Sequence, residues 1–118
     1  MKARIFIEYN NCNMKIVYNN IIPFEGFAAI NLFGIFFVRK NVIISDRLIN
    51  HESIHTAQMK ETLFIFFYIW YIIEWLIKFV PYGGEAYYNL SFEREAYQNA
   101  ENKDYLKNRK LFSFLKYL

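Results

Sequence analysis

Short apolar runs and polar breaks alternate along the N-terminal part of the chain, as they do in strands joined by turns. Three runs rich in β-branched and aromatic residues are separated by Asn-rich or Gly-containing segments: Arg4 to Tyr9, Lys15 to Tyr18 and Gly34 to Arg39. Lys40-Asn41 then separates two apolar stretches, Ile35 to Val38 and Val42 to Ile44, at a spacing compatible with a hairpin. We therefore expect a small N-terminal sheet, either antiparallel or mixed.

Helical patterns replace strand patterns from Ser45 onward. Ser45 and Asp46 are favourable N-cap residues, and neither Pro nor Gly interrupts the stretch from Arg47 to about Lys60. A second helix is expected from Thr62 to Val80, because a proline and then a pair of glycines follow it. A third helix is expected from Glu85 to Lys103. The predicted fold class is α+β, with the sheet followed by the first helix and two to three further helices.

Composition narrows the class of protein. The chain has 118 residues, enough for a single domain over residues 1–118, and 55% of them are apolar, which excludes a disordered chain. The net charge of +3 comes from scattered basic residues and argues against a nucleic-acid partner. Cys12 is the only cysteine, and Glu8 interrupts the N-terminal apolar run before a secretion signal can form. We expect a cytoplasmic protein without an intrachain disulfide.

Two apolar stretches raise the question of a membrane. The uncharged runs Gly26 to Val38 and Thr62 to Ile73 are each shorter than the ~20 residues that a spanning helix needs. Glu74 and Lys78 stand four residues apart in the favourable acid-first order, which indicates a solvent-facing side for the second helix. We expect this helix to pack against the sheet and its neighbours. Membrane insertion is the alternative, and peripheral membrane contact through exposed aromatic residues stays open.

The C-terminal segment from Tyr105 to Leu118 is basic and amphipathic. Its apolar residues are interspersed with basic ones: Lys107, Arg109, Lys110 and Lys116. This pattern predicts a helix that packs on the domain, and binding to a membrane surface is the alternative.

A candidate metal motif lies in the middle of the first predicted helix. His51-Glu52-Ser53-Ile54-His55 reads H-E-x-x-H, and residues four apart project from one face of a helix, so both imidazoles can reach one ion. The chain has 2 histidines, and both belong to this motif. We predict His51 and His55 as zinc ligands and Glu52 as the general base. The alternative is a surface helix that carries these histidines without a metal.

A catalytic zinc ion usually takes three protein ligands and leaves its fourth position for water. On the third predicted helix, Glu93 lies at the centre of an apolar stripe: Ala86, Leu90, Ala96, Tyr97 and Ala100. A carboxylate on an inward face needs a cation to offset its desolvation, so we predict Glu93 as the third ligand, with pairing to a Lys or Arg as the alternative. Glu95 is expected on the polar face with Gln98, Asn99 and Asn102.

From Val42 to Asn102 the chain resembles the gluzincin metallopeptidases, whose H-E-x-x-H helix is followed by a ligand glutamate on a later helix. Glu93-Arg94-Glu95-Ala96 is similar to the Glu-x-x-Ala or Glu-x-x-Cys motif of membrane-associated gluzincins, including prenyl-protein proteases and beta-lactam-sensing receptor peptidases. The resemblance implies a zincin-like fold, a Zn²⁺ cofactor, and Glu93 as the ligand. It also implies that Val42 to Ser45 is an edge strand that pairs with an extended peptide.

One position departs from that family. Its members usually place an Asp four residues after the ligand Glu, where it orients a zinc-bound histidine, and this chain has Tyr97 there. The Tyr97 hydroxyl could accept the imidazole N–H, and Gln58 or Glu61 could take the same part, because ligating histidines nearly always have such a partner. The tyrosines nearest in sequence to the ligand Glu are candidates for stabilising an oxyanion: Tyr87, Tyr88 and Tyr97.

These patterns predict a zinc-dependent metallopeptidase that hydrolyses a peptide or protein substrate, with Glu52 activating a zinc-bound water. The alternative is a non-catalytic zinc-binding protein, structural or membrane-associated, in which the metal ties the motif helix to the third helix. In a third hypothesis the motif is accidental and no metal binds.

Overall fold

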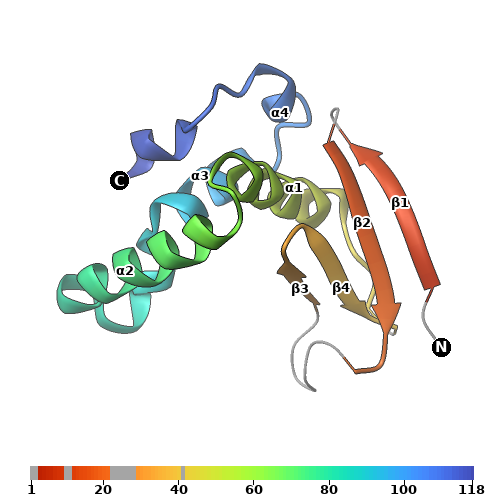
Figure 1. Ribbon diagram of the computed structural model, residues 1–118, viewed down its shortest axis with the longest axis horizontal. Coiled ribbons are helices and arrows are strands. Elements are labelled where there is room, and N and C mark those ends of the chain that lie inside the picture. The colour runs from red at the N-terminus through yellow and green to blue at the C-terminus, as the bar shows by residue number, and fades with distance from the viewer. Residues whose placement is uncertain (1–2, 10–11, 22–28, 41) are drawn as a thin grey trace.

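The fold is α+β, with a mixed sheet followed by helices, as predicted (Figure 1). The computed structural model describes residues 3–9, 12–21, 29–40 and 42–118. Asn10, Asn11 and Asn41 of the predicted turns lie outside these residues, as does the beginning of the apolar run Gly26 to Val38.

The sheet has the strand order β1-β2-β4-β3. Its strands are β1 (Ala3–Tyr9), β2 (Cys12–Asn19), β3 (Ala29–Leu32) and β4 (Ile35–Arg39). β1 pairs with β2 and β3 with β4 in antiparallel fashion, whereas β2 and β4 are parallel. The sheet is therefore mixed, and β3 is an edge strand.

The hairpin predicted at Lys40-Asn41 is wrong, because the chain turns earlier, at Phe33-Gly34. Phe33 and Gly34 have φ values of 52° and 84°, the two positive angles of a type I′ turn, and β3 and β4 flank them directly. Residues 42–45 form no strand. Val42 and Ile44 pack instead against the core between sheet and helix. Gly34 suits the second position of this turn, because residues that carry a side chain rarely adopt its positive φ.

Helix α1 (Asp46–Glu61) confirms the first predicted helix. The Ser45 hydroxyl caps it by accepting a hydrogen bond of 3.1 Å from the Leu48 N–H, and Asp46 and Lys60 complement its dipole at the two ends. One side of α1 packs on the sheet in a small core: Ile16, Phe36, Val38 and Ile49. Its C-terminal part joins a second core between helices: Met59, Phe67, Phe92 and Phe114.

The second helix is shifted from its prediction. α2 (Ile65–Tyr82) begins after a corner at Leu63 and Phe64, which both have positive φ, and it continues through Pro81 to Tyr82, with Gly83 as its C-cap. The third helix was predicted too long: a 3-10 helix, η1 (Gly83–Asn89), comes first, and α3 (Ser91–Asn99) follows. A contact with α2 stabilises the start of α3, because the Glu74 carboxylate accepts hydrogen bonds from the Ser91 N–H and hydroxyl at 2.6 and 2.5 Å.

The C-terminal segment forms two short helices, α4 (Tyr105–Asn108) and η2 (Ser113–Tyr117), instead of one amphipathic helix. The segment still packs on the protein, as predicted. The Phe114 ring is buried at 4.5 Å from the ring of Phe92 and 5.4 Å from that of Trp70, which anchors η2 beside α2 and α3.

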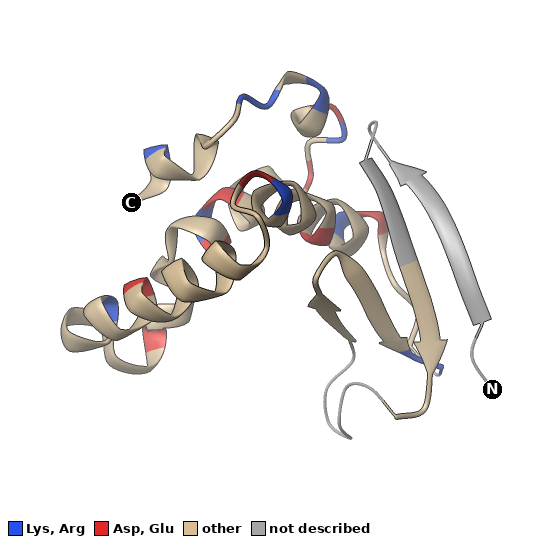
Figure 2. Cartoon of the chain, viewed as in Figure 1, with Lys and Arg blue, Asp and Glu red and all other residues tan. Residues whose placement is uncertain are grey.

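The prediction that α2 packs against the sheet and its neighbours is confirmed only for one side of the helix, where Phe67 joins the core between helices. Most of its apolar side chains are exposed, and Figure 2 shows its ribbon almost free of charge except at Glu74 and Lys78. Those two residues form the predicted ion pair, at 2.9 Å, but the pair faces η1 and α3 instead of solvent. By length and composition, the helical stretch Ile65–Asn99 could cross a membrane.

Candidate metal centre

Helices α1 and α3 bring three predicted ligands to one point. The Nε2 atoms of His51 and His55 lie 3.1 Å apart, and Glu93 Oε1 lies 3.4 Å from the first and 3.1 Å from the second. All three side chains are buried. The histidines converge because they are four residues apart on α1, and Glu93 reaches them from the first turn of α3.

The size of this triangle matches a tetrahedral zinc site. Zinc binds histidine nitrogen and carboxylate oxygen at about 2.0–2.2 Å, so tetrahedral ligand atoms lie about 3.3–3.5 Å from one another. The three observed separations of 3.1, 3.1 and 3.4 Å are close to that value. The described hydrogen bonds and ion pairs of Glu93 involve these histidines and a tyrosine, and no Lys or Arg. The alternative of a Glu93 paired with a Lys or Arg is thus not found among the described contacts, and the triangle has the dimensions of a metal site.

The tautomer of His55 follows from its neighbour Gln58. The Gln58 amide nitrogen donates to the Phe92 carbonyl at 3.1 Å and to Glu95 Oε1 at 2.9 Å, which fixes the orientation of the amide group. Gln58 Oε1 therefore accepts from Nδ1 of His55, at 2.8 Å. In neutral His55 the lone pair is then on Nε2, directed at the triangle, as a metal ligand requires.

Without a metal, the triangle attracts a proton. Burial lowers the pKa of His55, but the adjacent Glu93 carboxylate outweighs burial and raises it from 6.5 to about 9. Burial likewise raises the pKa of Glu93, and the two histidines outweigh it, holding that pKa well below its usual range. The triangle therefore favours a positive charge, either a proton on His55 or a metal ion between the three side chains.

Glu52 stands just outside the triangle. Its Oε2 atom lies 3.7 Å from His51 Nε2, farther than Glu93 Oε1, and the side chain lines a cavity next to the ligands. The Asn31 amide of β3 donates to the Glu52 carbonyl and to the Thr56 hydroxyl, each at 3.1 Å, and so joins the edge strand to this part of α1. A carboxylate oxygen of Glu52 also lies within 4.8 Å of ligand nitrogens of both histidines, so this position is compatible with a metal ligand as well as with a base beside the metal.

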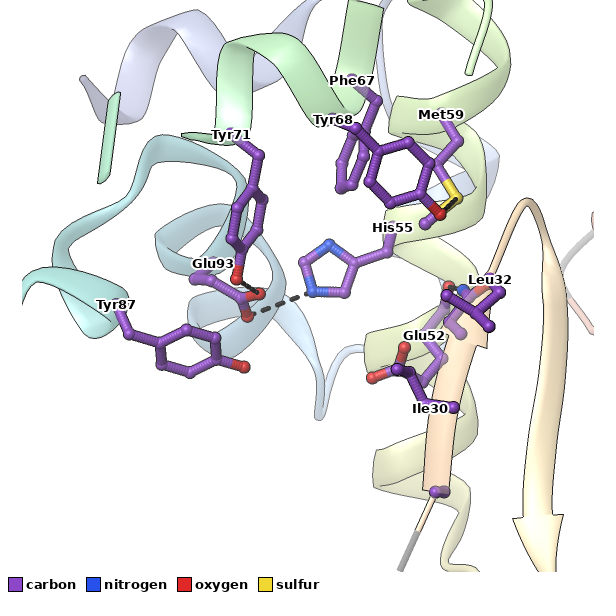
Figure 3. Close-up of a pocket in the computed structure, with 12 residues that line it drawn as sticks. Ile30, Leu32, Glu52, His55, Met59, Phe67, Tyr68, Tyr71, Tyr87 and Glu93 are labelled. Carbon is purple, nitrogen blue, oxygen red and sulfur yellow. Dashed lines mark hydrogen bonds and ion pairs between the residues drawn. The ribbon is translucent and has the colours of Figure 1, made fainter. Parts of the chain in front are cut away.

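Tyr71 of α2 completes the surroundings of Glu93. Its hydroxyl donates to Glu93 Oε2 at 2.9 Å, which leaves Oε1 directed at His55 (Figure 3). Burial and the Glu93 charge both raise the pKa of Tyr71, so it remains a donor. Sequence reasoning missed Tyr71, although it lies on the Glu74 and Lys78 side of α2, the side that turned out to face the protein.

A cavity of about 500 Å³ opens beside the triangle between the edge strand and the helices (Figure 3). Its lining is mostly apolar and aromatic: Ala29, Ile30, Asn31, Leu32, Glu52, His55, Met59, Phe67, Tyr68, Tyr71, Tyr87 and Glu93. The strand at this edge is β3, not Val42 to Ser45 as expected. Of the three tyrosines considered for an oxyanion, Tyr87 lines the cavity and Tyr88 and Tyr97 are outside its lining.

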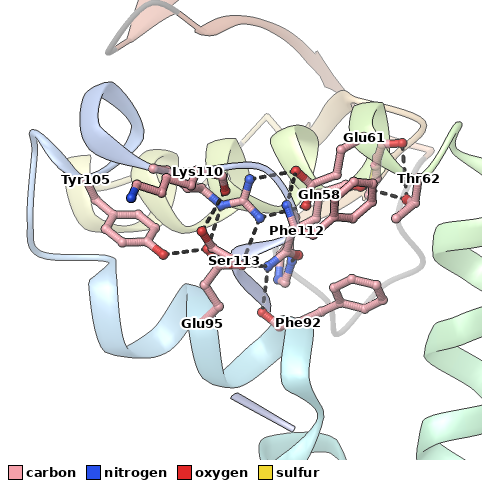
Figure 4. A network of polar contacts seen from close by, with 12 residues as sticks. Gln58, Glu61, Thr62, Phe92, Glu95, Tyr105, Lys110, Phe112 and Ser113 are labelled. Atoms are coloured by element: carbon pink, nitrogen blue, oxygen red, sulfur yellow. Dashed lines mark hydrogen bonds and ion pairs between the residues drawn. The ribbon is translucent and has the colours of Figure 1, made fainter. Parts of the chain in front are cut away.

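Glu95 was expected on a polar surface, and this is wrong: its side chain is fully buried. Arg109 donates to it through Nε at 2.5 Å and also makes a two-pronged pair with Glu61 at 2.8 and 2.9 Å (Figure 4). Tyr105 donates to the same carboxylate at 2.5 Å. Through Gln58, this buried network extends from the C-terminal segment to His55.

The three residues considered for orienting a histidine make different contacts. Gln58 bonds to His55, and Glu61 pairs with Arg109 instead. Tyr97 meets His51 through its ring, with centroids 4.6 Å apart. Tyr97 therefore packs against the ligand without taking up the role of the missing Asp.

Comparison with known proteins adds no relative to this picture. No family model matches the sequence, and neither a curated protein nor a solved structure gives a significant match. A function for this chain has to be inferred from its own geometry.

Proposed function

We propose that this protein is a zinc-dependent metallopeptidase whose metal is held by His51, His55 and Glu93. The observation that carries the proposal is the triangle of ligand atoms, with separations of 3.1–3.4 Å on buried side chains. A cavity next to it leaves room for water and substrate. Nitrogen and carboxylate donors in this number are typical of catalytic zinc.

When bound, zinc polarises a carbonyl group and makes water a stronger acid. Glu52 accepts the proton of the attacking water, whose oxygen bonds to the carbonyl carbon of the scissile peptide. Glu52 then passes that proton to the amine as the C–N bond breaks. Gln58 and Tyr71 hold His55 and Glu93 in their orientations through hydrogen bonds of 2.8 and 2.9 Å.

The walls of the cavity favour an extended peptide with an apolar side chain as the substrate. Among the described strands, only β4 pairs with β3, and it lies on one side, so an extended peptide can add to the other edge by backbone hydrogen bonds. Met59, Phe67 and Tyr68 offer apolar contact to a substrate side chain. A zincin-like arrangement, with the edge strand beside the motif helix and the third ligand on a later helix, is part of this proposal, as is action on the cytoplasmic side of the cell.

The decisive experiment compares the protein with its Glu52→Gln variant. We expect stoichiometric zinc in both by elemental analysis, and a loss of about a thousandfold in peptide-library cleavage by the variant, because the base is gone while the ligands remain. Glu101→Gln, on an exposed acid, is the matched control and keeps full activity. Equal cleavage by wild type and Glu52→Gln contradicts the proposal.

The same experiment separates the alternative of a non-catalytic zinc protein. That protein would contain zinc and lose thermal stability on chelation, yet neither wild type nor variant would cleave any peptide. Substoichiometric zinc in the wild type would instead show that the motif holds no metal.

A further inference from the structure

Helix α2 distributes its side chains in the opposite way to a surface helix of a water-soluble protein. Most of its apolar side chains are exposed, and its two charged side chains face the protein. At 100° per residue its exposed apolar side chains cover an arc of about 240°, from Tyr82 and Trp75 through Ile72 to Ile77 and Trp70. A single partner helix covers a stripe of roughly 100°. A surface this wide calls for an environment that surrounds the helix.

The polar groups of α2 are matched inside the protein. The Glu74 carboxylate accepts from Lys78, Ser91 and the Trp70 indole N–H, and Lys78 also donates to the Asn89 carbonyl. Within α2, these are the only two charged residues. Charges that pair with one another and face the protein interior are what a helix needs in order to lie among lipid chains.

The path of the chain decides how α2 could enter a bilayer. After Tyr82 the chain reverses at Gly83 and returns beside α2 as η1, so that Ser91 donates back to Glu74. Both arms of this hairpin, α2 and η1, thus connect to the rest of the protein on the same side (Figure 1). Glu85 on η1 is exposed, which places the η1 side toward water. This geometry suits a helix that lies in one leaflet, not one that crosses.

A basic segment lies next to the apolar surface. η2 is anchored to α2 by the contact between Phe114 and Trp70, and Leu111, Leu115 and Leu118 are exposed around it. The segment from Tyr105 to Leu118 carries four basic residues and no acid, and Lys110 and Lys116 are exposed. Apolar side chains bordered by lysines match acyl chains bordered by anionic headgroups.

We propose that α2 and the C-terminal segment bind an anionic lipid bilayer, with the apolar arc of α2 among the acyl chains of one leaflet and the C-terminal lysines at the headgroups. The breadth of the arc favours lipid over a second copy of the chain, and the adjacent basic segment favours anionic lipid over neutral lipid. The proposal goes beyond the peptidase function and does not depend on it.

The two tryptophans of the chain, Trp70 and Trp75, both belong to α2 and are partly exposed, so they serve as built-in probes. The full chain is mixed with vesicles of phosphatidylcholine and phosphatidylglycerol in equal parts. We expect it to float with the vesicles and its tryptophan fluorescence to be quenched by lipids brominated in mid-chain. Flotation without quenching, or a lipid-free dimer that buries the tryptophans and leaves vesicles unbound, overturns the proposal.

A matched pair of variants isolates α2. Ile73→Gln with Ile77→Gln should weaken vesicle binding on the order of a hundredfold, because both side chains leave the acyl region. Ile21→Gln with Ile43→Gln changes two isoleucines that are even more exposed, at 71% and 97%, but lie outside α2, and should bind as wild type does. Both variants are compared by circular dichroism for folding. Equal weakening by the two pairs contradicts the assignment of α2.

A second pair tests the charge. Lys110→Gln with Lys116→Gln should lower affinity for the anionic vesicles about thirtyfold and leave the weak binding to pure phosphatidylcholine unchanged. Lys40→Gln with Lys103→Gln removes the same net charge elsewhere on the surface and serves as the control. If both lysine pairs have the same effect, net charge alone explains binding and the role of the C-terminal segment is wrong.

Discussion

Helices α1 and α2 follow one another in the chain, yet they distribute polar and apolar side chains in opposite ways. α1 buries mainly polar side chains: Asn50, His51, Ser53, His55, Thr56 and Gln58. α2 exposes apolar residues over most of its circumference and turns its only acid and its only lysine inward. The protein thus has a buried polar cluster around α1, between its two apolar cores, beside an apolar surface on α2.

The difference shows what each helix needs from its surroundings. Buried polar groups are costly unless each finds a partner, and α1 obtains partners from α3 and from Arg109 of the C-terminal segment. Among its described buried side-chain atoms, Asn50 Oδ1 is left without a hydrogen bond. The His51, His55 and Glu93 triangle still needs a cation at its centre. α2 has its polar groups satisfied, and what it needs is an apolar medium. We propose a metal ion for the first of these needs and a lipid leaflet for the second.

The largest effect is expected from Arg109, which neutralises two buried acids. In Arg109→Met, Glu61 and Glu95 remain buried without a cation, and we expect a loss of about 3–5 kcal/mol in the free energy of unfolding. Urea denaturation of the metal-free protein measures it. The neighbouring Lys110→Met removes an exposed charge and should change stability little. Similar losses in both variants would show that the network does not support the polar interior.

Zinc should have the next largest effect. At a free concentration about 100 times the dissociation constant, it should stabilise the protein by about 2.7 kcal/mol, since only the folded chain has the triangle. In Glu93→Gln this gain should largely disappear. Differential scanning calorimetry with zinc and with a chelator tests both. A gain of equal size in wild type and variant would show that zinc binds elsewhere.

The pH dependence separates a proton from a metal in the triangle. In the metal-free protein the pKa of His55 is raised from 6.5 to about 9, so its contribution to stability is complete below pH 6.5 and is lost as the pH rises toward 9. Zinc must displace that proton, so its affinity should rise about tenfold per pH unit over the same range. Opposite slopes in unfolding and zinc titrations are the expected result, and parallel slopes would contradict it.

The sequence predicts those parts of the structure that depend on neighbours along the chain. The Ser45 cap fixes the start of α1, and the four-residue spacing of His51 and His55 fixes their convergence. Glu93 could be found as well, because its apolar neighbours mark the inward face of α3. Each of these follows from local geometry.

Other parts depend on distant contacts and could not be predicted. Glu95 is buried because Arg109, 14 residues later, neutralises it, and no local pattern announces that pair. For α2, the charged stripe at Glu74 and Lys78 was recognised, but a helical wheel does not show which face meets the protein. The hairpin was misplaced because Phe33 takes a positive φ that is unusual for a bulky side chain.

Gln58 is expected to have a smaller effect, confined mainly to the metal. Gln58→Met removes the acceptor of the His55 Nδ1–H, so the imidazole loses its fixed tautomer and orientation. Zinc affinity should fall by about 10–100-fold. Gln98→Met changes an exposed glutamine of the same helix as Glu93 and should leave affinity unchanged. Competition with a chromogenic chelator measures both, and an unchanged affinity in Gln58→Met would remove Gln58 from the site.

The smallest effect is expected from Tyr71, through which α2 contacts the metal site by way of Glu93 on α3. Tyr71→Phe keeps the ring among the aromatic residues of the helical core but removes the hydrogen bond of 2.9 Å to Glu93 Oε2. Loss of one hydrogen bond to a charged group costs roughly 1.5–3 kcal/mol at most, and part of it is recovered when zinc holds the carboxylate, so zinc affinity should fall by about tenfold. Tyr82→Phe, at the exposed end of α2, is the control. If Tyr71→Phe binds zinc as tightly as Tyr82→Phe does, the inward face of α2 contributes only to folding, and the metal site depends only on α1 and α3.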